Sequence, residues 1–236
     1  MENVLRLTAI SIVPILIAVT FHEVAHGFAA YLQGDRTAKS MGRLTLNPIA
    51  HIDPIGTVIM PLALLVLTRG KFVFGYAKPV PINPYNFKNP RKGMALSALA
   101  GPAMNLIIAI VCGVLFTWVL MPLSGSASPA LTARVLSPIT GMLAWGVFIN
   151  LLLAAFNLIP IPPLDGGRVL AGILPARQAY SLEKLERWGF LIVIVLIMTG
   201  IAYYFINPLM GFLVAVVDIF TKGQVGYILA RGGFGL

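Results

Sequence analysis

Long apolar runs separated by short polar stretches form the dominant pattern of this chain. The longer runs cover residues 4–32, 94–121, 135–159 and 188–206, and shorter ones cover 55–67 and 209–220. A helix needs about 20 apolar residues to cross the hydrocarbon core of a bilayer. The pattern therefore predicts an all-α polytopic membrane protein, a bundle of about four to six transmembrane or re-entrant helices.

The run at 55–67 is the ambiguous one. It has about 13 residues, contains Pro61 and is short for a span, so it suits a re-entrant hairpin or a tilted, kinked helix. Both of its flanks are basic, which puts them on the same side of the membrane and favours the hairpin over a full span. Just after it, residues 72–76 (F-V-F-G-Y) predict a small strand-like element near the cytoplasmic surface.

The remaining segments complete one predicted membrane domain over residues 1–236. Its core spans about residues 15–175, helices follow at 176–222, and the glycine-rich tail at 223–236 is expected to be disordered. Residues 122–133 are small, polar and uncharged and predict a loop. Residues 168–187 are charged and partly amphipathic, which is typical of a helix lying at the membrane interface.

Composition agrees with the bilayer as solvent. The chain is 58% hydrophobic and 11% charged, whereas soluble domains average about 45–50% and about 25%. The net charge of +9 would suggest nucleic acid as a partner of a soluble protein. Here the basic residues lie in short loops, where they set orientation and contact anionic lipid, so no nucleic acid is expected. Cys112 is the single cysteine, which excludes disulfides and cysteine-based metal sites.

The basic residues also predict an orientation. Residues 69–93 hold six basic and no acidic side chains, and residues 34–51 carry Arg36, Lys39 and Arg43 against Asp35. The positive-inside rule places both stretches in the cytoplasm and the uncharged residues 122–133 outside.

The first apolar run contains the pattern H-E-V-A-H at residues 22–26. Residues four apart lie on one face of a helix, so His22 and His26 can reach one metal ion, and Glu23 can contact a metal-bound water. Ionisable groups inside a hydrophobic span are expensive and indicate a functional site.

A catalytic zinc usually has three protein ligands, so a third is needed. His51 and Asp165 are the candidates. Asp165 closes the proline-rich turn at 160–165, an irregular backbone that is tolerated at membrane depth where it lines a wet cavity. His51 precedes an apolar stretch and fits a loop hydrogen bond, so Asp165 is favoured.

These motifs together resemble the site-2 protease family of intramembrane zinc metalloproteases, in a compact form without extra soluble domains. The resemblance rests on H-E-V-A-H, on F-N-L-I-P-I-P-P-L-D-G-G-R at 156–168 and on G-P-A-M-N at 101–105. It implies one Zn²⁺ per chain held by His22, His26 and Asp165, with Glu23 as general base. It also implies that Asn157 holds substrate or stabilises the oxyanion.

The resemblance further implies the cellular setting and the partners. The substrate is expected to be a transmembrane helix of a membrane-anchored protein or a signal-peptide remnant. The protein is expected in the inner, cytoplasmic membrane of a prokaryotic cell, with its active site toward the cytoplasm. Two other functions fit the same residues: a membrane metal transporter, and a catalytically inactive relative that binds helices. Asp53 and Arg168 are expected to have structural roles.

Overall fold

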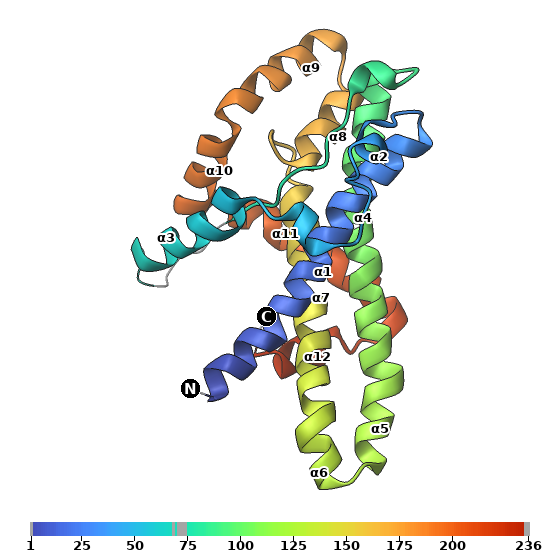
Figure 1. The fold of residues 1–236 in the computed structure, drawn as a ribbon, viewed down its shortest axis with the longest axis vertical. Helices are drawn as coiled ribbons and strands as arrows, with labels where there is room; N and C mark the ends of the chain where they lie inside the picture. The colour runs from blue at the N-terminus through green and yellow to red at the C-terminus, as the bar shows by residue number, and fades with distance from the viewer. Residues whose placement is uncertain (1, 68, 70–74, 234–236) are drawn as a thin grey trace.

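The computed structural model describes residues 2–67, 69 and 75–233, and within this part of the chain the regular structure is entirely helical (Figure 1). The α-helices are α1 (Glu2–Leu32), α2 (Thr37–Ser40), α3 (Met60–Leu67), α4 (Pro90–Val114), α5 (Met121–Ser126), α6 (Pro129–Leu131), α7 (Ser137–Asn157), α8 (Asp165–Ile173), α9 (Ala176–Glu183), α10 (Gly189–Met198), α11 (Ile201–Thr221) and α12 (Val225–Arg231). Short 3-10 segments are η1 (Pro48–His51), η3 (Pro84–Asn86) and η6 (Lys184–Trp188), and π-helical segments are η2 (Pro54–Ile59), η4 (Leu115–Leu120) and η5 (Thr132–Leu136).

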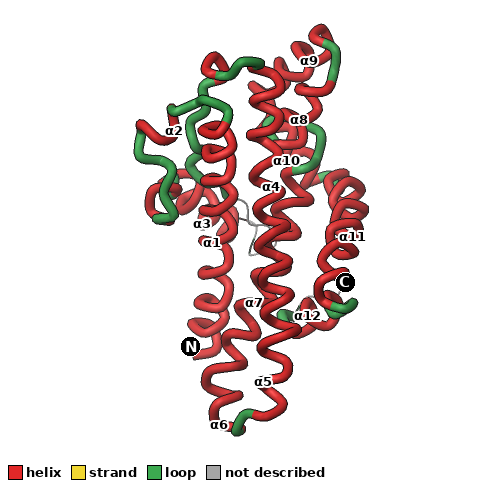
Figure 2. The backbone as a smooth tube through the Cα atoms, turned by 90° about the vertical axis from the view of Figure 1, so that its right-hand side faces the viewer, coloured by secondary structure: helices red, strands yellow, loops and turns green. Residues whose placement is uncertain are grey.

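Four helical stretches of the described chain are long and apolar enough to cross a membrane. They are Ile10–Leu32, Pro90–Ser126, Pro129–Asn157 and Ile201–Thr221. The helices α1, α4 and α7 pack against one another, and α11 packs on α4 and α7 (Figures 1 and 2). The prediction of an all-α polytopic membrane bundle is therefore confirmed.

Small residues let the spans approach closely. A Cβ atom added to Gly113 of α4 would lie 2.8 Å from the Thr221 side chain of α11, and one added to Gly146 of α7 would lie 2.8 Å from the Cys112 sulfur. Small residues at helix contacts are typical of membrane bundles, where packing replaces the hydrophobic effect as the main attraction between helices. Cys112 thus has a packing role, as its apolar surroundings in the sequence indicate.

The prediction of a loop at 122–133 is wrong. Within it, α5 continues from η4 to Ser126, and α6 begins again at Pro129. Proline is well tolerated in the first turn of a helix, where its missing N–H has no partner to lose, so Pro122 and Pro129 do not break the structure. The Ser128 side chain accepts a hydrogen bond from Leu131 N at 3.4 Å and caps the second helix.

The span predicted at 188–206 is also wrong, because the helix ends in its middle. Gly200 adopts φ +76°, a left-handed conformation that terminates α10 after ten residues. A new helix starts at Ile201 and continues through Pro208 to Thr221, so it joins the predicted short run 209–220 into one full span.

The prediction for the C-terminal tail, residues 223–236, is corrected as well. It was predicted to be disordered, yet Val225–Arg231 forms α12, which packs on α7 and α11. Val225, Ile228 and Leu229 have no exposed surface. Their spacing of three and four residues places them on one helix face, which buries enough apolar surface to order the segment.

The short apolar run at 55–67 forms η2 and α3, a helical stretch of 14 residues that is too short to cross a bilayer. In Figure 1 it points away from the long axis of the bundle. Asp53 has the predicted structural role, since its carboxylate accepts hydrogen bonds from Ile55 N and Gly56 N at the start of η2. Residues 72–74 of the predicted strand lie outside the described residues, and Tyr76 is not in a strand.

The charged stretch at 168–187 falls into three short helices, α8, α9 and η6, instead of one. Arg168 has the predicted structural role, because its guanidinium contacts the Glu186 carboxylate at 2.7 Å and links α8 to η6. Both side chains are about half-buried.

Candidate metal centre

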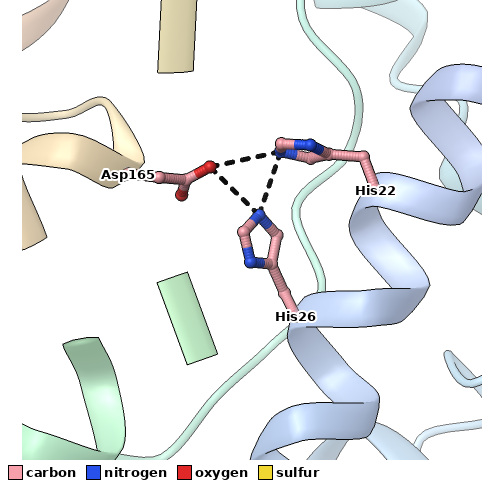
Figure 3. A group of neighbouring side chains, drawn as sticks. All are labelled: His22, His26 and Asp165. Carbon is pink, nitrogen blue, oxygen red and sulfur yellow. Dashed lines mark hydrogen bonds and ion pairs between the residues drawn. The ribbon is translucent and has the colours of Figure 1, made fainter. Parts of the chain in front are cut away.

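Three predicted ligands meet at one point inside the bundle. The Nε2 atoms of His22 and His26 on α1 lie 3.0 Å apart, and each is 3.3 Å from Oδ2 of Asp165, the first residue of α8 (Figure 3). All three residues are 9% exposed or less. Of the two candidates for the third ligand, the structure brings Asp165 to the histidines.

The turn before α8 explains why glycines follow Asp165. A Cβ atom on Gly166 would lie 2.3 Å from the Leu158 carbonyl oxygen, and one on Gly167 would lie 2.4 Å from Pro162 N. The chain thus folds back on its own backbone so closely that no side chain fits. This close turn brings α8 back against the end of α7 and fixes where its first residue, Asp165, lies.

Arg91 holds the other end of α8. Its guanidinium donates to the carbonyl oxygens of Ala171, at 2.7 Å, and Leu174, which belong to the last turn of the helix and the residue after it. A cation at this position satisfies carbonyls that have no partner within the helix and interacts favourably with the helix dipole. Arg91 lies in the first turn of α4, so α8 and its Asp165 are anchored to the central helix of the bundle.

Each imidazole is fixed by a hydrogen bond on the side away from Asp165. His22 Nδ1 lies 2.6 Å from Oδ1 of Asn105, and His26 Nδ1 lies 2.7 Å from the Ser97 carbonyl oxygen. Asn105 uses its amino group to donate to Ala18 O and Asn150 Oδ1, so its Oδ1 is the acceptor. Both Nδ1 atoms therefore carry a proton, and in the neutral imidazoles that bind metals both Nε2 atoms present lone pairs to Asp165.

With neutral imidazoles, the result is a cluster of three lone-pair atoms turned toward one another. In the described part of the chain, Asp165 Oδ2 is buried and has no hydrogen-bond donor. A tetrahedral zinc with ligand distances of about 2.0–2.1 Å holds its donor atoms about 3.3 Å apart. The observed separations of 3.0–3.3 Å match this value, so the residues fit a zinc ion.

The helix α4 packs directly against the two imidazoles of α1. A Cβ atom on Gly101 would lie 2.4 Å from His26 Cε1, 2.5 Å from His26 Nε2 and 2.6 Å from His22 Cε1. Gly101 therefore leaves the room that the two imidazoles and a metal need. The glycine thus permits the close approach of α4 to α1 at the metal centre.

Glu23 is held by a segment far away in the sequence. Its Oε2 accepts a hydrogen bond from the backbone N–H of Val80 at 2.9 Å. The Val80 side chain is buried, and its Cγ1 would be 2.6 Å from a Cβ on Gly27, one turn along α1. The segment 78–83, which contains Val80, thus contacts α1 beside the metal centre.

Both ends of this segment are fastened. Lys78 N donates to His51 O at 2.9 Å, and Asn83 N donates to Asp35 Oδ2 at 2.8 Å. Asp35 is fully buried just beyond the span of α1 and also accepts from Thr37 and Asn86. Burial raises the pKa of the Asp35 carboxyl, but these hydrogen bonds outweigh burial and hold the pKa below its usual range.

Two predicted residues lie outside the cluster. His51, the alternative third ligand, directs its Nε2 to the Thr45 carbonyl oxygen at 2.9 Å, the loop hydrogen bond that the sequence favoured. Asn157, at the last position of α7, donates from Nδ2 to the Leu153 carbonyl oxygen at 3.0 Å. Its role in catalysis stays a prediction.

Sequence reasoning missed Asn105 and Asn150. Asn105 orients the ring of His22, and Asn150 in turn holds Asn105 and donates to Gly146 O at 2.8 Å. Each is a lone amide inside an apolar run, and such polar groups within membrane helices indicate a specific partner. Asn105 was noted only as part of G-P-A-M-N, so that signal was present and was not used.

Comparisons with known proteins show the family of the chain. The model of peptidase family M50 matches residues 10–200. "Putative zinc metalloprotease YwhC" of Bacillus subtilis is 38% identical over 200 residues, which cover 85% of each chain. "Putative zinc metalloprotease Rip2" of Mycolicibacterium smegmatis is 30% identical over 188 residues, covering 78% of this chain and 64% of the relative. No solved structure matches the chain at a significant level. The chain therefore belongs to peptidase family M50, the site-2 protease family of zinc metalloproteases that its two-part motif resembles.

Proposed function

We propose that this protein hydrolyses peptide bonds in or near transmembrane segments of membrane-anchored proteins, signal-peptide remnants among them. The observation that carries the proposal is the meeting of His22, His26 and Asp165 between membrane helices, with three lone-pair donors turned toward one another. Such a site inside a span is suited to a reaction on a substrate that reaches it from the bilayer.

His22, His26 and Asp165 are the proposed ligands of one zinc ion. When bound, zinc polarises the scissile carbonyl and makes an attacking water acidic near neutral pH. The hydrogen bonds from His22 to Asn105 and from His26 to Ser97 O keep both rings in the orientation that binding needs. Outer contacts of this kind also raise the basicity of imidazole ligands.

Glu23 is the proposed general base. The Val80 N–H occupies its Oε2, and its Oε1 has no donor among the described residues. The Oε1 atom is thereby available to take a proton from the attacking water and to deliver it to the leaving nitrogen. Val80 is a positioning residue in this scheme, since it acts on the reaction only through Glu23.

Asn157 is the proposed oxyanion contact. One of its two amide N–H groups is used at Leu153 O, and the second can donate to the charge that develops on the substrate carbonyl. A donor of this kind contributes about 10²–10³-fold to the rate in well-characterised proteases.

The proposed orientation places the metal centre toward the cytoplasm. The centre lies nearer the end of the bundle that carries α2, α8 and α9 than the end formed by α5 and α6 (Figure 1). The basic residues of 34–51 and 78–92 cluster at that end, which the positive-inside rule assigns to the cytoplasm. For a prokaryotic cell this is the inner membrane.

The test is a cleavage assay on purified protein with a synthetic transmembrane peptide, combined with metal analysis. Glu23→Gln is expected to lower the cleavage rate by about 10²–10⁴-fold while the zinc content stays at one per chain. Asp165→Ala is expected to lose both zinc and cleavage. Glu183→Gln, a charge removal of the same type at the exposed end of α9, is the matched control and should cleave like the wild type.

The same material separates the other functions. Unchanged cleavage by Glu23→Gln would contradict the assigned base. Zinc flux into vesicles that survives Glu23→Gln, with no cleavage by the wild type, would identify a transporter. Binding of the peptide without cleavage by the wild type in the presence of zinc would identify an inactive helix-binding protein.

A further inference from the structure

A cavity of about 770 Å³ lies at the end of the bundle remote from the metal centre. Its walls come from α1, η4, α5, η5, α7 and α12, and the tip of this end is formed by α5 and α6 (Figures 1 and 2). The volume is within the range of about 300–1,000 Å³ that ligand pockets have. None of the residues assigned to the reaction lines it.

The cavity is lined by both apolar and polar side chains, and the polar ones include the hydroxyl groups of Thr132, Ser137 and Thr140. Ile10, Phe116 and Leu120 are buried in its wall and offer only hydrocarbon and aromatic surface. Ser124 and Arg231 also line it. Neither the Ser124 hydroxyl nor the two Nη groups of Arg231 meet an acceptor within the described chain. This combination suits a molecule with a long apolar body and an anionic head.

The Arg231 guanidinium is oriented by Tyr227 and leaves its Nη groups available to an anion. Its Nε donates to the Tyr227 hydroxyl at 2.9 Å, and its guanidinium lies 5.2 Å from the centre of that ring. Among the described residues it pairs with no carboxylate. The helix α12 that carries both residues is seated by the buried side chains of Val225, Ile228 and Leu229, so this wall of the cavity is fixed.

Neighbouring aromatic and basic residues mark this level as a membrane interface. Trp118 donates from Nε1 to Phe220 O at 3.1 Å, and Lys222 places its Nζ 4.0 Å above the Trp118 ring. Tryptophan and tyrosine concentrate at the headgroup level of bilayers, and lysine there reaches toward the lipid phosphates. The cavity and Arg231 are thus at the depth where headgroups of the leaflet remote from the metal centre lie.

We propose that this cavity binds one anionic phospholipid of that leaflet, with its phosphate on Arg231 and Ser124 and an acyl chain against Phe116 and Leu120. The charge on Arg231 gives the site a preference for anionic over zwitterionic headgroups. The bound lipid fills the space between α1, α7 and α12 and ties the C-terminal helix to the bundle.

The experiment is native mass spectrometry of the full-length protein after equilibration with equal amounts of phosphatidylglycerol and phosphatidylcholine that have identical chains. The wild type is expected to retain one phosphatidylglycerol with about tenfold preference, the ratio that one charge-assisted hydrogen bond provides. Arg231→Gln is expected to bring the preference close to one. Arg134→Gln, an exposed arginine of η5 outside the cavity, is the matched control and should keep the preference.

A second variant tests the cavity itself. Gly125 lines the cavity, and a Cβ there would meet no atom within 4 Å, so Gly125→Phe is expected to fill the space and abolish lipid retention. Gly211→Phe on α11 has equally open surroundings outside the cavity and should bind as the wild type does. Equal retention of both lipids by the wild type, or unchanged retention by Gly125→Phe, would overturn the proposal. None of these measurements depends on peptidase activity.

Discussion

Gly101 and Gly125 belong to one continuous helical stretch, Pro90–Ser126, yet they mark two differently built ends of the molecule. At Gly101 an added Cβ would lie within 2.6 Å of the imidazoles of both His22 and His26. At Gly125 it would meet nothing within 4 Å. The first glycine is needed because neighbouring groups fill the space completely, whereas the second borders space that the protein does not fill.

The polar groups of the two ends differ in the same way. Around the metal centre, His22, His26 and Asn105 are each fixed by hydrogen bonds to buried partners. At the remote end, the Arg231 side chain has one hydrogen bond within the described residues, to Tyr227 one turn earlier on its own helix. A catalytic centre requires donors held within a fraction of an ångström, while a lipid site requires space and one charge. The comparison teaches that polar residues among apolar helices are held by several buried partners in one place and by a single contact beside open space in the other.

The largest effect is expected from giving the two glycines the same side chain. Gly101→Val places methyl groups where the imidazoles and the metal must be, so zinc binding and cleavage should fall by more than about 100-fold, the upper part of the range for disturbed metal sites. Gly125→Val should keep zinc binding and cleavage within about twofold of the wild type, because its Cβ meets open space. Metal analysis and the peptide assay measure this, and similar losses in the two variants would remove the distinction.

A smaller effect is expected at the partner of His22. Asn105→Leu keeps the approximate volume but removes the acceptor that fixes the ring, so zinc affinity should fall by about 10–100-fold. Asn150→Leu should have a weaker effect, because Asn150 reaches His22 only through Asn105. Competition with a chelator of known affinity gives both values. An Asn150 variant that loses as much affinity as the Asn105 variant would show that the pair acts as one unit.

Removing the hydrogen bond to Glu23 is expected to slow the reaction without affecting the metal. Val80→Pro deletes the N–H that binds Oε2, and a hydrogen bond to a charged group is worth about tenfold or more in rate. We expect kcat to fall about tenfold with KM and zinc content unchanged. Val80→Ala keeps the N–H and is the control. Equal kcat values for the two variants would assign Val80 a packing role alone.

The smallest effect concerns stability and pH at Asp35. Because the folded-state pKa of Asp35 lies below the unfolded value of about 3.9, its carboxylate stabilises the fold above that value, and this stabilisation is lost as the pH falls through the folded pKa. The difference in Tm between wild type and Asp35→Asn should be constant from about pH 8 to 5 and shrink below about pH 4. Calorimetry in detergent measures it. A difference that stays constant down to pH 3 would contradict the assignment.

The elements that sequence predicted well are those set by local spacing and length. His22 and His26 share a face because four residues make about one helical turn, and the apolar runs at 4–32, 94–121 and 135–159 are long enough to require spans. The errors lie where a single residue or a distant contact decides. Gly200 ends α10 through its left-handed conformation, and α12 is ordered because Val225 and its neighbours find α7 and α11 to pack against.

The sequence by itself determined that this is a membrane protein and that His22 and His26 share one face of its first long helix. Those features follow from chain length, hydropathy and helical period, which act between near neighbours. Only the tertiary structure decided that Asn105 holds His22, 83 residues away, and that Val80 holds Glu23, 57 residues away. It also created the cavity beside Arg231. Contacts between distant segments depend on how whole helices pack, and no local pattern encodes them.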